Sequence, residues 1–319
     1  MFIASPPPPP PKPIIVWVHG TRGSSFMPWV EMNKPLKKRI DSLTRTPKGL
    51  HPLANLNQES KSHKLLTALS EADPEQFPYE SIYAFGWSGK LDGPSRKKAA
   101  QRLYAALGEL TATYKRTYGI APPIILISHS HGGNVILHMA PFYQQYDDIA
   151  IKKTVLIACP VQQDTASAPN NPLFGKVYSL HSHVDIVQIM DPQRLQPYRE
   201  AFLQWQETKS WTPLKEAYLL SLEQPLFSER HFPTSSRLIQ ANICWNSFTP
   251  YSDPQASSTN KLETFINWAM NHLIQQKRGV LHSEFITPEF IQHLPVILTQ
   301  LDKRMATGNL PKQDIDIVI

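Results

Sequence analysis

The chain has 319 residues, of which 41% are apolar and 18% are charged. This composition excludes a disordered chain, and no segment approaches the roughly 18 consecutive apolar residues that a membrane span needs. The formal net charge of +6 allows transient contact with an anionic membrane surface but does not by itself indicate nucleic-acid binding, so we expect no nucleic-acid partner.

Residues 1–13 are a proline-rich arm, since seven of the 30 prolines lie between Pro6 and Pro13. Because proline fixes φ and lacks an N–H, this run predicts an extended polyproline II segment. We interpret it as a stiff lead-in to the first strand, with docking into an SH3-, WW- or profilin-type groove as the alternative. The N-terminus lacks the basic and apolar regions of a secretory signal, so we expect a cytoplasmic protein, with export by another route left open.

From residue 14 onward, short apolar runs that end at glycine, serine or proline alternate with amphipathic segments. The runs predict strands at 14–18, 81–85, 124–127, 154–158, 177–180 and 238–245. The amphipathic segments predict helices at 95–117, 132–146 and 288–304, the last of them capped by Thr287. This alternation predicts an α/β fold with a doubly wound, mostly parallel sheet that is covered by helices on both faces.

Residues of about 190–235 break this alternation, because they are rich in proline, glutamine and aromatic residues. We expect a helical insertion or cap on a single domain that comprises residues 14–319. The spacing of Tyr198, Phe202 and Trp205 favours packing of these rings in the core.

The strongest chemical signal follows the strand at 124–127. Ser130 lies between two small residues, Ser128 and Gly132, in a turn that joins a buried strand to an amphipathic helix. A nucleophile elbow needs this arrangement, since small residues on either side of the serine let strand and helix pass closely. The pattern predicts that Ser130 is a catalytic nucleophile.

With this turn, the chain resembles the α/β-hydrolase superfamily of serine esterases and lipases. The sequence HGTRG at residues 19–23, after the first strand, is similar to the family's HGxxG oxyanion loop. The resemblance implies that the backbone N–H groups of Thr21 and His131 form an oxyanion hole. Trp87 is interpreted either as a wall of the acyl pocket or as a core residue, and the Trp-Ser-Gly sequence around it loosely resembles lipase-like hydrolases related to the DUF676 and PGAP1 groups.

In this family the acid follows the serine and precedes the histidine. The resemblance implies that Asp185 is the acid of the triad, because it lies in a turn similar to the family's S-x-x-D-x-V sequence. Asp191 is the alternative. His181 and His183 lie beside Asp185 and could bind zinc with it, but the catalytic role already explains Asp185. We therefore expect no metal and no cofactor.

The histidine of the triad is expected in the last third of the chain. His282 precedes the predicted final helix in a loop that is similar to the family's H-S-x-F sequence. His231 is a rival, and so are His272 and His293, which lie in helix-like segments where packing or solvation is expected.

The resemblance implies a serine hydrolase that cleaves a carboxylic ester through a Ser-His-Asp triad and an acyl-enzyme. The substrate is expected to be a small-molecule or lipid ester with a hydrophobic acyl group, and residues 14–319 would be the catalytic domain. Within enzymes, a thioesterase or an acyltransferase is the alternative. A catalytically silent adaptor that binds a partner through its proline-rich arm is a second hypothesis, of another class.

Overall fold

The structure is a computed structural model. The residues that it describes are 12–21, 46–144, 148–190, 193, 201–202, 204–205, 208–223, 225–245, 278–307 and 314–319. Within these ranges, no helix is both long enough and apolar enough to cross a membrane. Several residues named above lie outside the described residues: Pro6–Pro11, Arg22, Gly23, Asp191, Tyr198 and His272.

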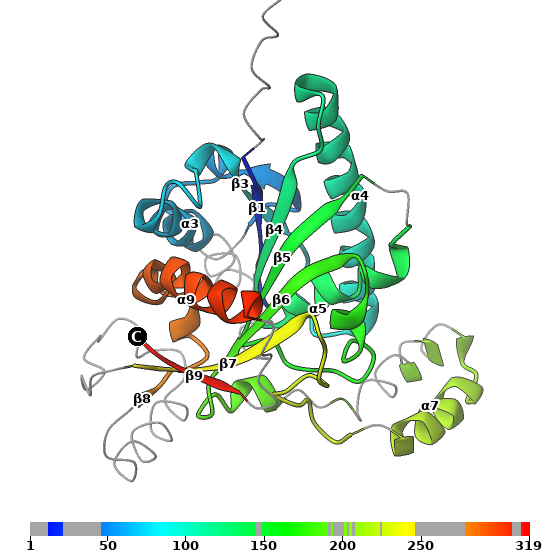
Figure 1. The fold of residues 1–319 in the computed structure, drawn as a ribbon. Helices are drawn as coiled ribbons and strands as arrows, with labels where there is room; N and C mark the ends of the chain where they lie inside the picture. Colours follow the sequence, from blue (N-terminus) through cyan, green and yellow to red (C-terminus); the bar gives the residue numbers. More distant parts are fainter. Residues whose placement is uncertain are drawn as a thin grey trace, which may run out of the picture.

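The apolar runs form the middle of a nine-stranded sheet in the described part of the chain (Figure 1). Its order is β2-β3-β1-β4-β5-β6-β7-β8, with β9 also paired to β7. The six strands that pair in parallel along its centre are β1 (Ile14–Val18), β3 (Ile82–Gly86), β4 (Pro123–His129), β5 (Ala150–Ile157), β6 (Phe174–His181) and β7 (Leu238–Trp245). Each overlaps a predicted strand, so the mostly parallel α/β class is confirmed.

Three further strands were not among the predicted ones. These are β2 (Gly49–Pro52) and β8 (Arg278–Gly279), which are antiparallel to β3 and β7, and β9 (Ile315–Val318), which is parallel to β7. The first two are short and contain glycine or proline, so their sequences carry no strand pattern. The third alternates as a half-buried strand should, with Ile315 and Ile317 buried and Asp316 exposed. That alternation was the signal that could have identified β9.

Helices cover both faces of the sheet (Figure 1). One face carries α3 (Lys61–Ala72) and α9 (Pro288–Ala306), and the other carries α4 (Gly93–Tyr118) and α5 (His131–Leu137). Successive strand residues point to opposite faces of the sheet. Ile15 therefore packs in the core beneath α3 and α9, and its neighbour Val16 packs in the core beneath α4 and α5. Burial on both sides explains why these strands are continuous apolar runs.

The predicted helices at 95–117 and 288–304 are confirmed as α4 and α9. As expected, Thr287 caps α9, its Oγ1 accepting a hydrogen bond of 3.3 Å from the N–H of Phe290. The helix predicted at 132–146 is too long, because α5 ends at Leu137 and the chain continues as a 3₁₀ turn at Ala140–Phe142. Pro141 in that turn has no N–H to continue an α-helix.

The order of the strands creates a switch point at one edge of the sheet. β1 lies between β3 and β4, so the chain adds β3 on one side of β1 and then crosses to add β4 on the other. At such a switch point, the carboxyl ends of the two neighbouring strands leave a binding crevice. Residues 19–21 follow the end of β1, and Ser130 follows the end of β4.

The predicted insertion at 190–235 is described in part and contains α7 (Thr212–Glu223). The expectation that Phe202 packs in the core is wrong, because 48% of this residue is exposed and its ring stacks on Trp205. Trp211 and Tyr218 are also exposed. These aromatic side chains therefore contribute to the surface of the insertion.

Candidate active site

Ser130 occupies a strained turn between β4 and α5. Its backbone angles are φ 52° and ψ −135°, a conformation that costs a residue other than glycine on the order of 1–3 kcal/mol. The turn is held by a hydrogen bond of 2.8 Å from the N–H of Ser130 to the carbonyl of Ile157, at the end of β5. The structure therefore shows the elbow geometry that the sequence predicted around Ser130.

Two glycines let the neighbouring backbone approach Ser130 closely. A Cβ atom on Gly132 would lie 2.3 Å from the carbonyl oxygen of Val18, so only glycine lets α5 pass the end of β1. A Cβ atom on Gly20 would lie 2.9 Å from the Cβ of Ser130. The loop that contains Gly20 and Thr21 is therefore packed directly against the elbow, as the oxyanion-loop prediction requires.

His282, which is partly exposed, and the buried Asp185 form a hydrogen-bonded pair. Nδ1 of His282 lies 2.8 Å from Oδ2 of Asp185, whose side chain is fully buried. The other carboxylate oxygen, Oδ1, accepts a hydrogen bond of 3.1 Å from the N–H of Gln188. Both oxygens are thus occupied, and the carboxylate fixes the imidazole with its Nε2 on the far side of the ring.

The turn that contains Asp185 and the loop that contains His282 are joined by a hydrogen bond. The N–H of Val280 donates a hydrogen bond of 3.0 Å to Oγ of Ser182, which stands three residues before Asp185. A Cβ atom on Gly279 would lie 2.3 Å from a methyl group of Val184, so glycine is needed for this close approach. The turn after β6 and the loop before α9 therefore meet as one unit.

His129, which the sequence analysis did not single out, links His282 to the elbow. Its Nε2 lies 3.1 Å from the carbonyl oxygen of His282, and the two ring centroids are 4.6 Å apart. Burial, and then the nearby His282, hold the pKa of His129 well below its usual range. The neutral ring can therefore donate its Nε2–H to that carbonyl, which places the His282 loop beside the residue that precedes Ser130.

The side chain of His131 is buried under the elbow. Its Nδ1 faces two donors, Nη1 of Arg96 at 3.5 Å and Nδ2 of Asn134 at 3.3 Å. Burial, and then the charge of Arg96, hold the pKa of His131 well below its usual range. The neutral imidazole thus anchors the first turn of α5, while its backbone N–H is the group expected to contact an oxyanion.

Trp87 packs behind the loop after β1. Only 3% of it is exposed, its Nε1–H donates a hydrogen bond of 2.7 Å to the carbonyl of His19, and its N–H donates one of 3.2 Å to Nε2 of His19. These contacts place the indole in the core, where it holds the loop that contains Thr21. A contact between Trp87 and substrate stays a prediction.

The described rivals for the base lie elsewhere. The ring of His293, on α9, has its centroid 5.9 Å from that of Trp245. His231 instead contacts Asp314. Among the described histidines discussed above, His282 is the one that the structure joins to the predicted acid.

No family model matches this chain, and no curated protein matches it either. Among solved structures, a gene product of Listeria innocua is 14% identical over 72% of this chain and 98% of that chain, with a TM-score of 0.30. A thermostable carboxylesterase from a metagenomic library is 12% identical over 95% and 81%, with a TM-score of 0.29. A thermostable carboxyl esterase from Bacillus coagulans is 11% identical over 94% and 92%, also with a TM-score of 0.29.

These similarities are weak, and the activities in their names belong to the neighbours. This chain has an α/β-hydrolase fold, which is defined by its mostly parallel sheet with a switch point and by the elbow between β4 and α5.

Proposed function

We propose that this protein is a serine hydrolase that cleaves carboxylic esters, with Ser130, His282 and Asp185 as its catalytic triad. The observation that carries the proposal is the 2.8 Å bond between His282 and the buried Asp185, next to the strained turn at Ser130. Sequence motifs support all three residues, and the backbone strain at Ser130 and the hydrogen bond between His282 and Asp185 add to that support.

The roles follow from the proposed triad. His282 takes the proton from Oγ of Ser130 as this oxygen attacks the acyl carbonyl, and Asp185 stabilises the imidazolium that forms. The N–H groups of Thr21 and His131 stabilise the oxyanion, which typically contributes a factor of about 10²–10³ in rate for each donor. His282 then returns the proton to the leaving alcohol, and water hydrolyses the acyl-enzyme.

The proposed substrate is a lipid or another ester with a hydrophobic acyl group. Large apolar side chains are exposed in and beside the insertion, at Met190, Phe202, Trp211, Tyr218, Leu219, Leu226 and Phe227. A surface of this kind supports contact with an apolar ligand or transiently with a membrane. A thioesterase or an acyltransferase would use the same three residues, so measured rates on esters and thioesters of equal chain length distinguish these reactions.

The test of the proposal is labelling with a fluorophosphonate probe together with hydrolysis of p-nitrophenyl esters. Wild type should be labelled, and Ser130→Ala should lose labelling and at least about 10⁴-fold in kcat. Ser283→Ala is the matched control, because Ser283 is exposed and adjoins His282. A folded wild type that neither reacts with the probe nor hydrolyses any ester would refute the proposal.

Several predictions made from the sequence stay predictions. The proline-rich arm and its SH3-, WW- or profilin-type partner fall outside the described residues except at Lys12 and Pro13. Three more also stay predictions: cytoplasmic residence, the division into an arm, a catalytic domain and a cap, and the DUF676 and PGAP1 resemblance.

A further inference from the structure

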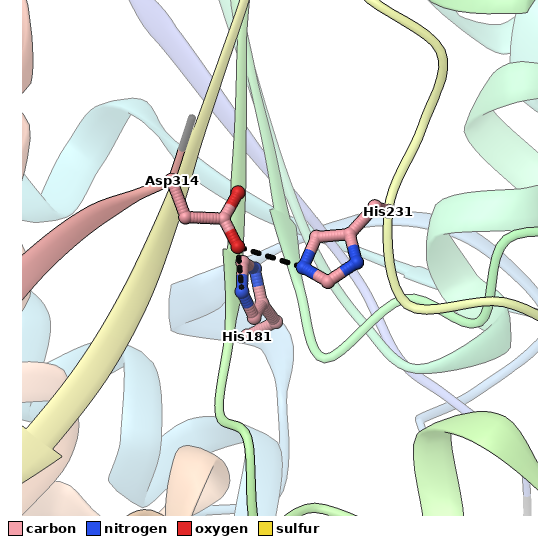
Figure 2. Close-up of side chains that lie close together, drawn as sticks. All are labelled: His181, His231 and Asp314. Carbon is pink, nitrogen blue, oxygen red and sulfur yellow. Dashed lines mark hydrogen bonds and ion pairs between the residues drawn. The ribbon is translucent and has the colours of Figure 1, made fainter. Parts of the chain in front are cut away.

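A second histidine–aspartate cluster lies outside the proposed triad (Figure 2). His181 ends β6, His231 lies in the segment before β7, and Asp314 directly precedes β9. Nε2 of His181 lies 3.0 Å from Oδ2 of Asp314, and Nε2 of His231 lies 2.7 Å from the same oxygen. Figure 2 shows the three side chains pointing toward one another from three separate segments.

In the sequence, His181 lies close to other possible ligands. His181, His183 and Asp185 could together bind zinc, but the catalytic role expected for Asp185 argues against that set. In the structure Asp185 binds His282, whereas His181 groups with two residues that are distant in sequence.

The buried member of the cluster lacks ordinary hydrogen bonds. His181 is fully buried, and neither of its ring nitrogens makes a hydrogen bond within the described part of the chain. The 3.0 Å approach of Nε2 to Asp314 therefore has the length of an ion pair without the direction of a hydrogen bond. Leaving a buried polar atom without a hydrogen bond costs about 1–3 kcal/mol. A cation bound at Nε2 would remove that cost for Nε2 alone.

The spacing of the three ligand atoms suits a small divalent cation. All three lie within 4.8 Å of one another. Zinc bonds of about 2.0–2.1 Å at tetrahedral angles hold neighbouring ligand atoms about 3.3 Å apart. The observed contacts of 2.7 and 3.0 Å would therefore open by about 0.6 and about 0.3 Å when zinc binds.

We propose that His181, His231 and Asp314 form a binding site for a divalent first-row metal, with zinc favoured by the two imidazoles and water as a fourth ligand. The positive guanidinium of Arg230 interacts electrostatically with both Asp185 and Asp314. Its charge therefore weakens the attraction of the site for a cation. We therefore expect weaker binding than at a zinc site with four protein ligands. The bound metal joins β9 to the end of β6, four residues before Asp185.

The experiment uses the full chain after treatment with a chelator and dialysis. Calorimetric titration with Zn²⁺ should show one ion bound per chain, Co²⁺ should give a visible absorption band, and Zn²⁺ should raise Tm. His231→Ala should weaken Zn²⁺ binding about a hundredfold or more, because even the loss of a group behind a ligand costs about 10–100-fold. His231 is exposed, so this variant is expected to fold.

His183→Ala is the matched control, because His183 is exposed and its ring centroid is 5.7 Å from that of His181, yet it is not among the proposed ligands. It should bind Zn²⁺ as wild type does, and so should Ser130→Ala, so the result does not depend on ester hydrolysis. A folded wild type that binds no Zn²⁺, or equal losses in His231→Ala and His183→Ala, would overturn the site and leave a simple His–Asp network.

Discussion

The ends of the strands carry two histidine–aspartate contacts that are built from the same side chains in opposite orientations. At His282, Nδ1 meets Oδ2 of Asp185, while Oδ1 of that carboxylate is held by a backbone N–H. At Asp314, a single carboxylate oxygen instead lies within 3.0 Å of Nε2 of His181 and of Nε2 of His231. The first arrangement orients one imidazole and leaves its Nε2 for another partner, whereas the second makes three ligand atoms converge on a single point.

A His–Asp contact alone therefore does not define a chemical role. Its function depends on which nitrogen faces the carboxylate and on what lies beyond the ring. Beyond His282 lies His129, next to the strained turn of Ser130. Beside the Asp314 cluster lies the start of β9.

The largest expected effect comes from removing one carboxylate at a time. Asp185→Asn should lower kcat about 10⁴-fold, since loss of the acid leaves the base in the wrong tautomer, while Zn²⁺ binding stays as in wild type. Asp314→Asn should do the reverse and abolish Zn²⁺ binding with kcat nearly unchanged. Ester hydrolysis and calorimetry on both variants test this, and a variant that loses both properties would show that the two sites are not separate.

A smaller effect is expected at His129, a positioning residue. His129→Phe keeps a ring of similar size but removes the donor to the carbonyl of His282, so kcat should fall about 10–100-fold with KM little changed. His129→Gln retains an amide donor and should recover part of the loss. If both variants keep the wild-type kcat, or if they change only Tm, then His129 does not position the base.

The smallest effect is expected at Asp302, an aspartate in α9 whose partners are two lysines and a tyrosine. Lys153, Lys176 and the hydroxyl of Tyr178 all donate to its carboxylate. Burial raises the pKa of Asp302, but these donors, led by Lys153, outweigh it and the pKa lies below its usual value. Asp302→Asn should therefore lower the free energy of unfolding by about 1 kcal/mol at neutral pH.

The pH dependence of this effect has a definite sign. Because the folded-state pKa is depressed, the stabilisation is complete above the ordinary aspartate pKa of about 3.9 and disappears as the pH falls through the lower, folded-state value. Urea unfolding of wild type and Asp302→Asn from neutral to acidic pH measures it. A difference that grows on acidification would contradict this account of Asp302.

The sequence predicted what is encoded locally. The six central strands are continuous apolar runs, and Ser130 stands in a short motif between a strand and a helix. Asp185 and His282 were predicted from short motifs that resemble those of a family. Two local predictions were wrong. The helix predicted at 132–146 ends earlier, at Leu137, and Phe202, which was expected in the core, is exposed.

The second cluster could not be predicted in this way. His231 and Asp314 are 83 residues apart, and neither belongs to a motif. They meet because β7 pairs with β6 on one side and with β9 on the other. His129 was missed for a related reason, since its role depends on the carbonyl of a residue far along the chain.

The pairing of β9 has one further consequence, which concerns self-association. Ile315–Val318 pairs with residues 241–244 of β7 and so covers backbone groups that would otherwise form an open sheet edge. Open edges of apolar strands recruit strands from other molecules. A chain that stopped before Ile315 would keep every residue of the proposed triad, yet it would be prone to oligomerise through β7.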